Sequence, residues 1–305
     1  MLRFIRRGWS AVLWAAGCAA AVSGATAPLK VVATTGMVGD LVERIGRERV
    51  QVQTLMGAGV DPHLYKATAS DVRKLQRADV VFYNGLLLEG KMTDIFTRMQ
   101  RAGRHVYAIA DHLPHETLLH PAGQSGHPDP HIWFDISLWA QCVDAVVDGL
   151  VEAQPDAAAA FRAGGERAKV ELAALHDWAV AKSAELPAAK RILVTSHDAY
   201  SYFGRAYGFQ VIGLQGISTV SEAALADMAT LVDFIRNREI KAIFVETSVP
   251  HATIERIATD AKVAIGGELF SDAMGTPGQV ENGYDLGTFD GMVKHNLNTI
   301  VEALR

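Results

Sequence analysis

The chain has 305 residues, of which 49% are hydrophobic and 21% are charged, and it carries a formal net charge of −5. This composition is that of a globular protein and excludes a disordered, collagen-like or coiled-coil chain, while the negative charge argues against nucleic acid as the main partner. Only two cysteines are present, so neither a disulfide scaffold nor a cysteine-rich zinc finger can form, and a transition-metal site has to use histidines and carboxylates.

The first 25 residues predict a secretory signal peptide. Arg3, Arg6 and Arg7 precede an apolar run and then small residues, which is the pattern of an exported chain. We expect cleavage after Ala25 and a periplasmic mature protein. The apolar run is short for a membrane span of about 20 residues, so an uncleaved anchor is the weaker interpretation. Lipidation at Cys18 is a further alternative, ranked below cleavage because the leucine usual in a lipoprotein site is missing.

From residue 28 to residue 153, short apolar runs alternate with amphipathic stretches. The predicted strands are residues 30–35, 50–56, 79–83 and 105–109. The predicted helices are residues 38–46, 70–78 (with Ser70 as the N-cap), 91–102 and 137–153, with a loop over 111–131. Such alternation is typical of parallel βαβ units, and it predicts an N-terminal α/β lobe over 28–153.

Residues 154–187 predict one long linking helix that ends at Pro187. Its expected apolar stripe comprises Val170, Leu172, Leu175, Trp178 and Ala181. The alternation then restarts, with strands expected over 191–195, 209–213, 241–245 and 263–266, and helices over 200–207, 221–237, 252–261 and from 289. This pattern predicts a C-terminal α/β lobe over 188–305. The expected fold is therefore α/β, with two lobes that each have a central, mostly parallel sheet.

One tripeptide occurs twice, as Asp61-Pro62-His63 and as Asp129-Pro130-His131. In each copy proline restricts the backbone, so that a histidine is presented from a stiff turn. His197 directly follows a predicted strand, where open α/β folds place their ligands, and Asp272 lies in the loop after another strand. Imidazole and carboxylate groups are ligands for zinc. The four candidate ligands are far apart in the sequence, and such long spacing is weak evidence for a metal site by itself. A single histidine is more often a surface or core residue than a metal ligand. The repeated tripeptide makes a ligand role more plausible for His63 and His131.

Six segments in chain order resemble the zinc- and manganese-binding solute-binding proteins of metal ABC importers. They are GVDPHLY (59–65), NGLLLE (84–89), DPHIWFD (129–135), TSHDAY (195–200), FVETS (244–248) and LFSDAMG (269–275). The resemblance extends from about Lys30 to Arg305. It implies two α/β lobes bridged by a long helix, with one divalent metal ion bound in the cleft between them and delivered to a membrane permease. The ligands of that family fall on His63, His131, His197 and Asp272.

The expected ligand set favours zinc, with manganese as the alternative. Three imidazoles and one carboxylate form a zinc-like set, and manganese- or iron-preferring members of the family often carry Glu where this chain has His197. Manganese stays in play if Asp272 binds through both oxygens. We expect no enzymatic activity, because four protein ligands leave no open position for a catalytic water. We also expect a monomer without an ATP site. A secreted metallohydrolase that uses the same ligands and a surface adhesin are the alternatives.

Other polar side chains near these motifs have less definite expected roles. Glu246 is a candidate to orient a ligating histidine, and a salt bridge or cap at a strand end is the competing interpretation. We interpret three aspartates as turn and helix-start residues: Asp61, Asp129 and Asp198. Three aromatic residues are expected to pack around the ligand loops: Tyr65, Trp133 and Phe134. Four histidines of the loop before His131 are interpreted as solvated side chains rather than as an auxiliary zinc site: His112, His115, His120 and His127.

Overall fold

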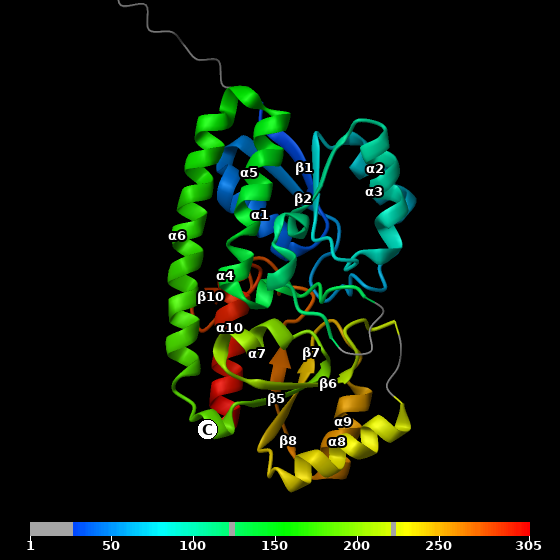
Figure 1. Ribbon diagram of the computed structural model, residues 1–305, viewed down its shortest axis with the longest axis vertical. Coiled ribbons are helices and arrows are strands. Elements are labelled where there is room, and N and C mark those ends of the chain that lie inside the picture. The colour runs from blue at the N-terminus through cyan, green and yellow to red at the C-terminus, as the bar shows by residue number, and fades with distance from the viewer. Residues whose placement is uncertain (1–26, 122–125, 221–223) are drawn as a thin grey trace, which may run out of the picture.

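The computed structural model describes residues 27–121, 126–220 and 224–305. The predicted signal peptide, the alternative lipid attachment at Cys18 and the first three residues of the helix expected over 221–237 lie outside the described residues. Two α/β lobes lie one above the other, and a single long helix runs along both of them (Figure 1). This arrangement confirms the predicted fold class. The predicted limits of the two lobes, 28–153 and 188–305, stay predictions.

The N-terminal lobe is built on a four-stranded parallel sheet with the strand order β2-β1-β3-β4. Its four strands are short: the two central ones are mostly apolar and buried, as expected for parallel strands that helices cover, and the two edge ones, VQVQT and HVYA, alternate in burial. They are β1 (Leu29–Ala33), β2 (Val50–Thr54), β3 (Val80–Tyr83) and β4 (His105–Ala108). Helices on both faces complete the lobe: α1 (Gly36–Gly46), α2 (Ala69–Arg77), α3 (Thr93–Arg101), α4 (Ile136–Trp139) and α5 (Cys142–Ala153). In Figure 1, α1 and α5 lie on one side of the sheet and α2 and α3 on the other.

The C-terminal lobe contains two parallel strand pairs, β5-β6 and β7-β8, and β5 contacts β7. These strands are β5 (Ile192–His197), β6 (Gln210–Gln215), β7 (Ala242–Glu246) and β8 (Ala264–Leu269). The helices of the lobe are α7 (Ser201–Tyr207), α8 (Leu225–Asn237), α9 (Ala252–Ala261) and α10 (Phe289–Leu304). A short antiparallel hairpin of β9 (Val280–Glu281) and β10 (Tyr284–Asp285) lies in what the sequence predicts to be plain loop before α10.

The linking helix α6 (Ala158–Ser183) packs on α1, α4 and α5 of the N-terminal lobe and on α7 and α10 of the C-terminal lobe. The predicted apolar stripe is only partly right, because Val170 is 71% exposed and Ala181 is also exposed. The buried face consists of Phe161, Gly164, Gly165, Ala168, Leu172, Leu175, Ala179 and Ser183. Small residues form much of this face because α6 approaches α1 very closely. A Cβ atom at Gly164 would lie 2.1 Å from the backbone oxygen of Ile45.

Two local details differ from the sequence prediction. The N-cap of α2 is Thr68 rather than Ser70, since Thr68 and Asp71 form a reciprocal capping box. The helix predicted over 137–153 is divided into α4 and α5, because Gln141 N donates to Leu138 O (3.0 Å) and Val143 N to Ala140 O (3.4 Å), which are three-residue rather than four-residue bonds.

Among the helices of the described residues, none combines the length and the apolar character that a bilayer crossing requires.

Candidate metal centre

Four side chains that are far apart in the sequence meet at one point between the lobes. One donor atom from each of His63, His131, His197 and Asp272 lies within 4.8 Å of the other three. The Nε2 atoms of His63 and His131 are 3.3 Å apart. The Asp272 carboxylate lies 3.3 Å from His131 Nε2, 3.4 Å from His197 Nε2 and 3.9 Å from His63 Nε2. The structure therefore brings together all four residues that the sequence predicts as metal ligands.

The fold explains why these four residues meet. His63 lies in the loop after β2, and His131 lies directly before a short 3₁₀ helix (Ile132–Phe134) that leads to α4. His197 is the last residue of β5, and Asp272 follows β8. In parallel α/β units the loops after the carboxyl ends of the strands gather at one edge of the sheet. The two lobes face each other with these edges, and each supplies two of the four side chains.

The four side chains are removed from solvent. His131 and His197 are 0% exposed, Asp272 is 1% exposed and His63 is 6% exposed. Within the described residues, neither carboxylate oxygen of Asp272 nor His197 Nε2 has a hydrogen-bond partner. A buried, unpartnered carboxylate is strongly unfavourable unless a cation compensates it. Imidazole nitrogens and a carboxylate oxygen suit Zn²⁺, and the same set accepts related divalent ions.

A buried carboxylate orients His131. Asp129 Oδ1 lies 2.7 Å from His131 Nδ1 and also accepts the backbone N–H of His131 at 2.9 Å. A carboxylate oxygen accepts hydrogen bonds, so Nδ1 carries a hydrogen and Nε2 is the ring nitrogen that faces the centre of the site. The sequence interpretation of Asp129 as a turn residue is therefore incomplete, because Asp129 also fixes the ring orientation of His131.

Glu246, at the end of β7, has the corresponding position beside His197. Its Oε2 atom lies 2.5 Å from His197 Nδ1, and its Oε1 atom accepts the backbone N–H of His197 at 2.9 Å. Glu246 is fully buried. Of the two interpretations that the sequence leaves open for Glu246, the contact with a candidate ligand is the one found.

Asp61 differs from Asp129 although both precede Pro-His. Its Oδ1 atom accepts the backbone N–H of His63 at 2.8 Å, as expected for a turn residue. Its Oδ2 atom accepts the hydroxyl hydrogen of Thr219 at 2.6 Å, so Asp61 joins the two lobes beside the site. Asp198 lies shortly before α7 and accepts a hydrogen bond from the Ser201 hydroxyl at 2.7 Å, but it does not cap the helix, because the N-cap residue is Tyr200.

The charges around the site shift the pKa values of its groups in opposite directions. Burial lowers the pKa of His63 to about 3. Burial also disfavours the charged form of His131, but attraction to Asp129 and Asp272 outweighs it and raises the pKa to about 9. The same competition, with Glu246 and Asp272 as the anions, raises the pKa of His197. Burial would raise the pKa of Asp272, yet His197 and His131 hold it well below its usual value.

Aromatic side chains close the interior side of the site. Trp133 Nε1 donates to Ser271 O at 3.1 Å, directly before Asp272 in the chain. Phe134 packs on Tyr200 with ring centroids 4.2 Å apart, and the Tyr200 hydroxyl donates to Phe270 O at 2.9 Å. Trp133 and Phe134 thus pack beside the ligand loops as predicted. Tyr65 instead packs in a separate cluster of the N-terminal lobe and donates its hydroxyl to Asp71 at 2.8 Å.

The outer side of the site opens on a cavity of about 370 Å³ between the lobes. His63 is the only one of the four candidate ligands that lines it, and the cavity wall also includes His127, Leu87, Lys91 and Val220. Within the described residues, the four converging side chains are the only group of three or more His, Cys, Asp or Glu residues close enough to hold a metal ion. The interpretation of the loop histidines as solvated side chains stays a prediction.

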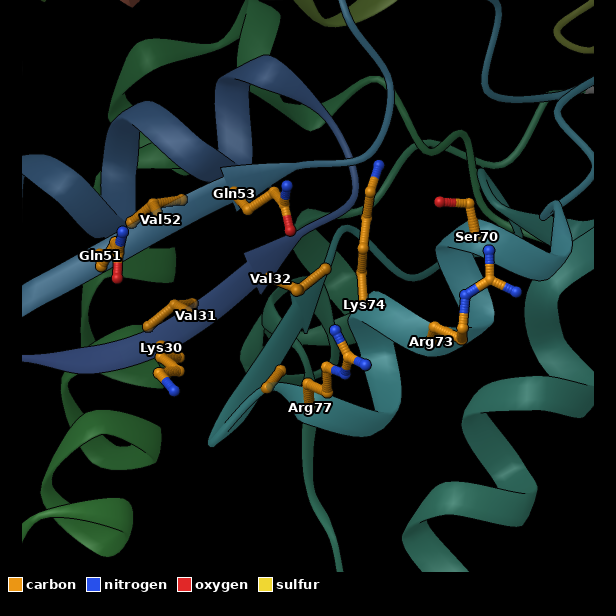
Figure 2. A pocket seen from close by; sticks show the side chains of 11 residues that line it. Lys30, Val31, Val32, Gln51, Val52, Gln53, Ser70, Arg73, Lys74 and Arg77 are labelled. Atoms are coloured by element: carbon orange, nitrogen blue, oxygen red, sulfur yellow. The ribbon is translucent and has the colours of Figure 1, made fainter.

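A second concavity lies on the face of β1 and β2 beside α2 (Figure 2). It measures about 490 Å³, and four of its lining residues are basic: Lys30, Arg73, Lys74 and Arg77. None of the buried, unpartnered side-chain atoms of the described residues belongs to this groove. A solvated basic groove of this kind carries no assignment to a ligand.

Comparisons with a protein family, with related sequences and with solved structures each match nearly the whole chain. Residues 31–303 match the family described as ZnuA, zinc-uptake complex component A, periplasmic. The manganese-binding lipoprotein MntA of Bacillus subtilis is 45% identical over 296 residues, which cover 95% of this chain and 94% of MntA. The zinc-binding protein TroA of Treponema pallidum is 46% identical over 279 residues, which cover 90% of this chain and 88% of TroA. The solved structure of the periplasmic zinc-binding protein TroA from Treponema pallidum matches with a TM-score of 0.85 at 44% identity and covers 91% of this chain and 99% of its own.

Proposed function

Because the chain belongs to the ZnuA family of periplasmic zinc-uptake components, we propose that it binds a divalent transition metal ion outside the cytoplasm and delivers it to an ABC permease for import. The observation that carries this proposal is the convergence of three imidazoles and one carboxylate on a buried point between two lobes. His63, His131, His197 and Asp272 are the proposed ligands. The metal ion is the cargo, and the chain itself performs no reaction on it.

Zinc is the favoured cargo and manganese the alternative. The relatives do not decide between them, since the proteins named as manganese-binding and zinc-binding are 45% and 46% identical to this chain. The donor set favours zinc, because three nitrogen donors with one carboxylate suit a borderline ion better than the oxygen-preferring Mn²⁺. Four buried donors would complete a tetrahedral shell, which is the arrangement of a site that holds a metal ion rather than one that activates a water molecule. This geometry supports a transport role over the metallohydrolase alternative.

A monomer suffices for this function, since all four donors come from one chain. For the amino terminus we propose a cleaved signal peptide that ends at Ala25. Lipidation at Cys18 is the alternative, and MntA of Bacillus subtilis is a relative named as a lipoprotein. The mass of the mature amino terminus distinguishes a chain that begins near Thr26 from one that begins with a diacylglyceryl cysteine. A surface adhesin role stays an untested alternative.

Calorimetric titration of the metal-free protein with Zn²⁺ and with Mn²⁺ tests the proposal. We expect tight 1:1 binding of zinc and weaker binding of manganese. Each of the variants His63→Ala, His131→Ala, His197→Ala and Asp272→Ala should weaken zinc binding by at least about 10- to 100-fold, the range seen when even outer partners of a metal are removed. His105→Ala, which removes a partly exposed histidine on β4, is the control and should bind like the wild type. Unchanged zinc affinity in all four ligand variants would contradict the proposal, as would chelator-sensitive hydrolysis of a generic ester by the zinc-loaded protein.

A further inference from the structure

Arg44 joins three helices that belong to different parts of the molecule. It lies on α1, and its guanidinium contacts Asp40 on the same helix at 3.2 Å and Glu171 on the linking helix α6 at 3.2 Å. A third ion pair joins Arg44 to Asp290 in the first turn of α10, 246 residues further along the chain. The Arg44 side chain is 15% exposed, so these pairs are partly shielded from water. One side chain thus ties the N-terminal lobe to the linking helix and to the C-terminal lobe.

A second contact attaches α1 to the start of α10. Asp40 Oδ1 accepts the backbone N–H of Phe289, the first residue of α10, at 3.2 Å. The N-cap residue Thr288 accepts the backbone N–H of Gly291 at 3.1 Å and so fixes the first turn. Asp40 and Arg44 together hold this turn against the N-terminal lobe.

Hydrogen bonds connect the start of α10 to the loop that carries Asp272. Gly275 N donates to Leu286 O at 2.8 Å, which links a residue three positions after Asp272 to one three positions before Phe289. The Asp285 carboxylate accepts the backbone N–H groups of Gly278 at 3.0 Å and Gly287 at 2.9 Å. The loop is therefore closed on itself rather than extended between β8 and α10.

The first residue of α1 contacts the same loop near Asp272. A Cβ atom at Gly36 would lie 3.0 Å from Met274 Cε, so Met274 packs directly on the helix start. Helix α1 therefore contacts the Asp272 loop at Met274 through its first residue, and it contacts the start of α10 through Asp40 and Arg44. These contacts run from Arg44 to the position of Asp272.

We infer that Arg44 is a positioning residue for the metal site. Its ion pair with Asp290 holds the Asp272 carboxylate in the position from which it can share a metal ion with His63 and His131 of the other lobe. This inference rests on the proposed function, because it concerns the same metal ion. Arg44 itself contacts none of the four candidate ligands. Its action passes through the start of α10 and the closed loop to Asp272, whereas its pair with Glu171 leads only to the linking helix.

The two ion pairs provide a matched comparison, since Asp290 and Glu171 contact the same guanidinium and their side chains are 35% and 43% exposed. Asp290→Asn and Glu171→Gln each remove one charge and keep the shape of the side chain. We expect Asp290→Asn to weaken zinc binding by about tenfold, the lower end of the range for outer partners of a metal. We also expect it to change the visible d–d absorption of the Co²⁺-substituted protein, because the carboxylate donor shifts. Glu171→Gln should match the wild type in both measurements.

The Co²⁺ spectrum separates positioning from a purely structural role, since a loss of stability alone leaves the coordination of the bound ion unchanged. Arg44→Met should show the same changes as Asp290→Asn, but larger ones. If Arg44→Met does not fold, the comparison of Asp290→Asn with Glu171→Gln tests the inference by itself. Equal behaviour of Asp290→Asn and Glu171→Gln would overturn the inference. Failure of the wild-type protein to bind either metal would instead overturn the proposed function.

Discussion

Asp61 and Asp129 occupy the same place in two copies of one tripeptide, yet their carboxylates have different partners. Asp129 contacts the imidazole of His131 at 2.7 Å, whereas Asp61 contacts backbone N–H groups and the Thr219 hydroxyl. We predict that Asp129→Asn lowers zinc affinity by about 10- to 100-fold, because an amide no longer enforces the hydrogen on Nδ1 of the ligand. Asp61→Asn should have a clearly smaller effect. Competition with a chromophoric chelator measures both constants, and equal losses would contradict this assignment.

The metal-free site is expected to hold protons that the metal ion displaces. The pKa of His131 is raised to about 9, so its imidazole is protonated at pH 7 without metal, and the pKa of His197 is raised as well. Zinc needs their neutral forms, and binding at pH 7 should therefore release at least one proton per zinc ion. Apparent zinc affinity should accordingly fall as the pH is lowered from 8 to 6. Calorimetry in two buffers of different protonation enthalpy counts the protons, and a count of zero would contradict this prediction.

At the scale of residues, the sequence predicts which side chains could bind a metal but not how they are oriented. The repeated Asp-Pro-His and the family resemblance pointed to His63 and His131 because their local pattern is short and contiguous. The contact between Asp129 and His131 depends on a side-chain rotamer and on burial by the opposite lobe, where Tyr202 donates to Asp129 O at 2.9 Å. Identical tripeptides cannot reveal such a difference.

At the scale of elements, small residues form much of the buried face of α6, and we expect one substitution there to lower the stability that it would raise in most helices. Replacing glycine by alanine inside a helix normally gains about 1 kcal/mol. Gly164→Ala should instead lower the free energy of unfolding by about 1–3 kcal/mol, because its Cβ would lie 2.1 Å from Ile45 O, a backbone atom. Gly165→Ala, whose Cβ would meet the Val147 side chain at 2.6 Å, should be less harmful since a side chain can move. Urea unfolding of the metal-free proteins measures both, and a stabilised Gly164→Ala variant would contradict the packing.

Elements whose pattern is strong were predicted, and those that depend on contacts were not. The alternation of short apolar segments and amphipathic stretches identifies β1 to β8 and most helices, because each strand contains apolar residues within a segment too short for a helix. The stripe on α6 was misassigned because Val170 is apolar yet exposed, while Gly164 and Ala168 provide the contact surface. Hydropathy measures how apolar a side chain is. It therefore does not predict a contact between two helices that forms because the residues between them are small.

At the scale of the whole molecule, the metal ion would join the two lobes, since each lobe supplies two donors. Binding only to the folded state then stabilises it, by about 4 kcal/mol when free zinc is 1,000 times the dissociation constant. We predict that zinc raises the melting temperature of the wild type, and that a chelator reverses the shift. Asp272→Ala should lose the shift while His105→Ala keeps it. Scanning calorimetry with and without zinc measures this, and an equal shift in Asp272→Ala and the wild type would exclude Asp272 as a ligand.

The pattern of strands and helices alone does not predict how one lobe is placed on the other; only the family resemblance implied a metal site in the cleft between them. Alternating strands and helices predict two separate βαβ lobes because each forms from neighbouring segments. The ion pair between Arg44 and Asp290 joins residues 246 positions apart, and neither residue lies in a recognisable motif. Such contacts depend on the final arrangement of both lobes.

The unequal exposure of the candidate ligands also bears on the order in which bonds to the cargo form and break. His63 alone borders the outer cavity, while His131, His197 and Asp272 lie behind it. An ion arriving from solvent therefore passes His63 before it reaches the inner three donors, and a departing ion leaves past it. We therefore expect stepwise exchange, in which His63 is the last donor to bind an entering ion and the first to release a departing one.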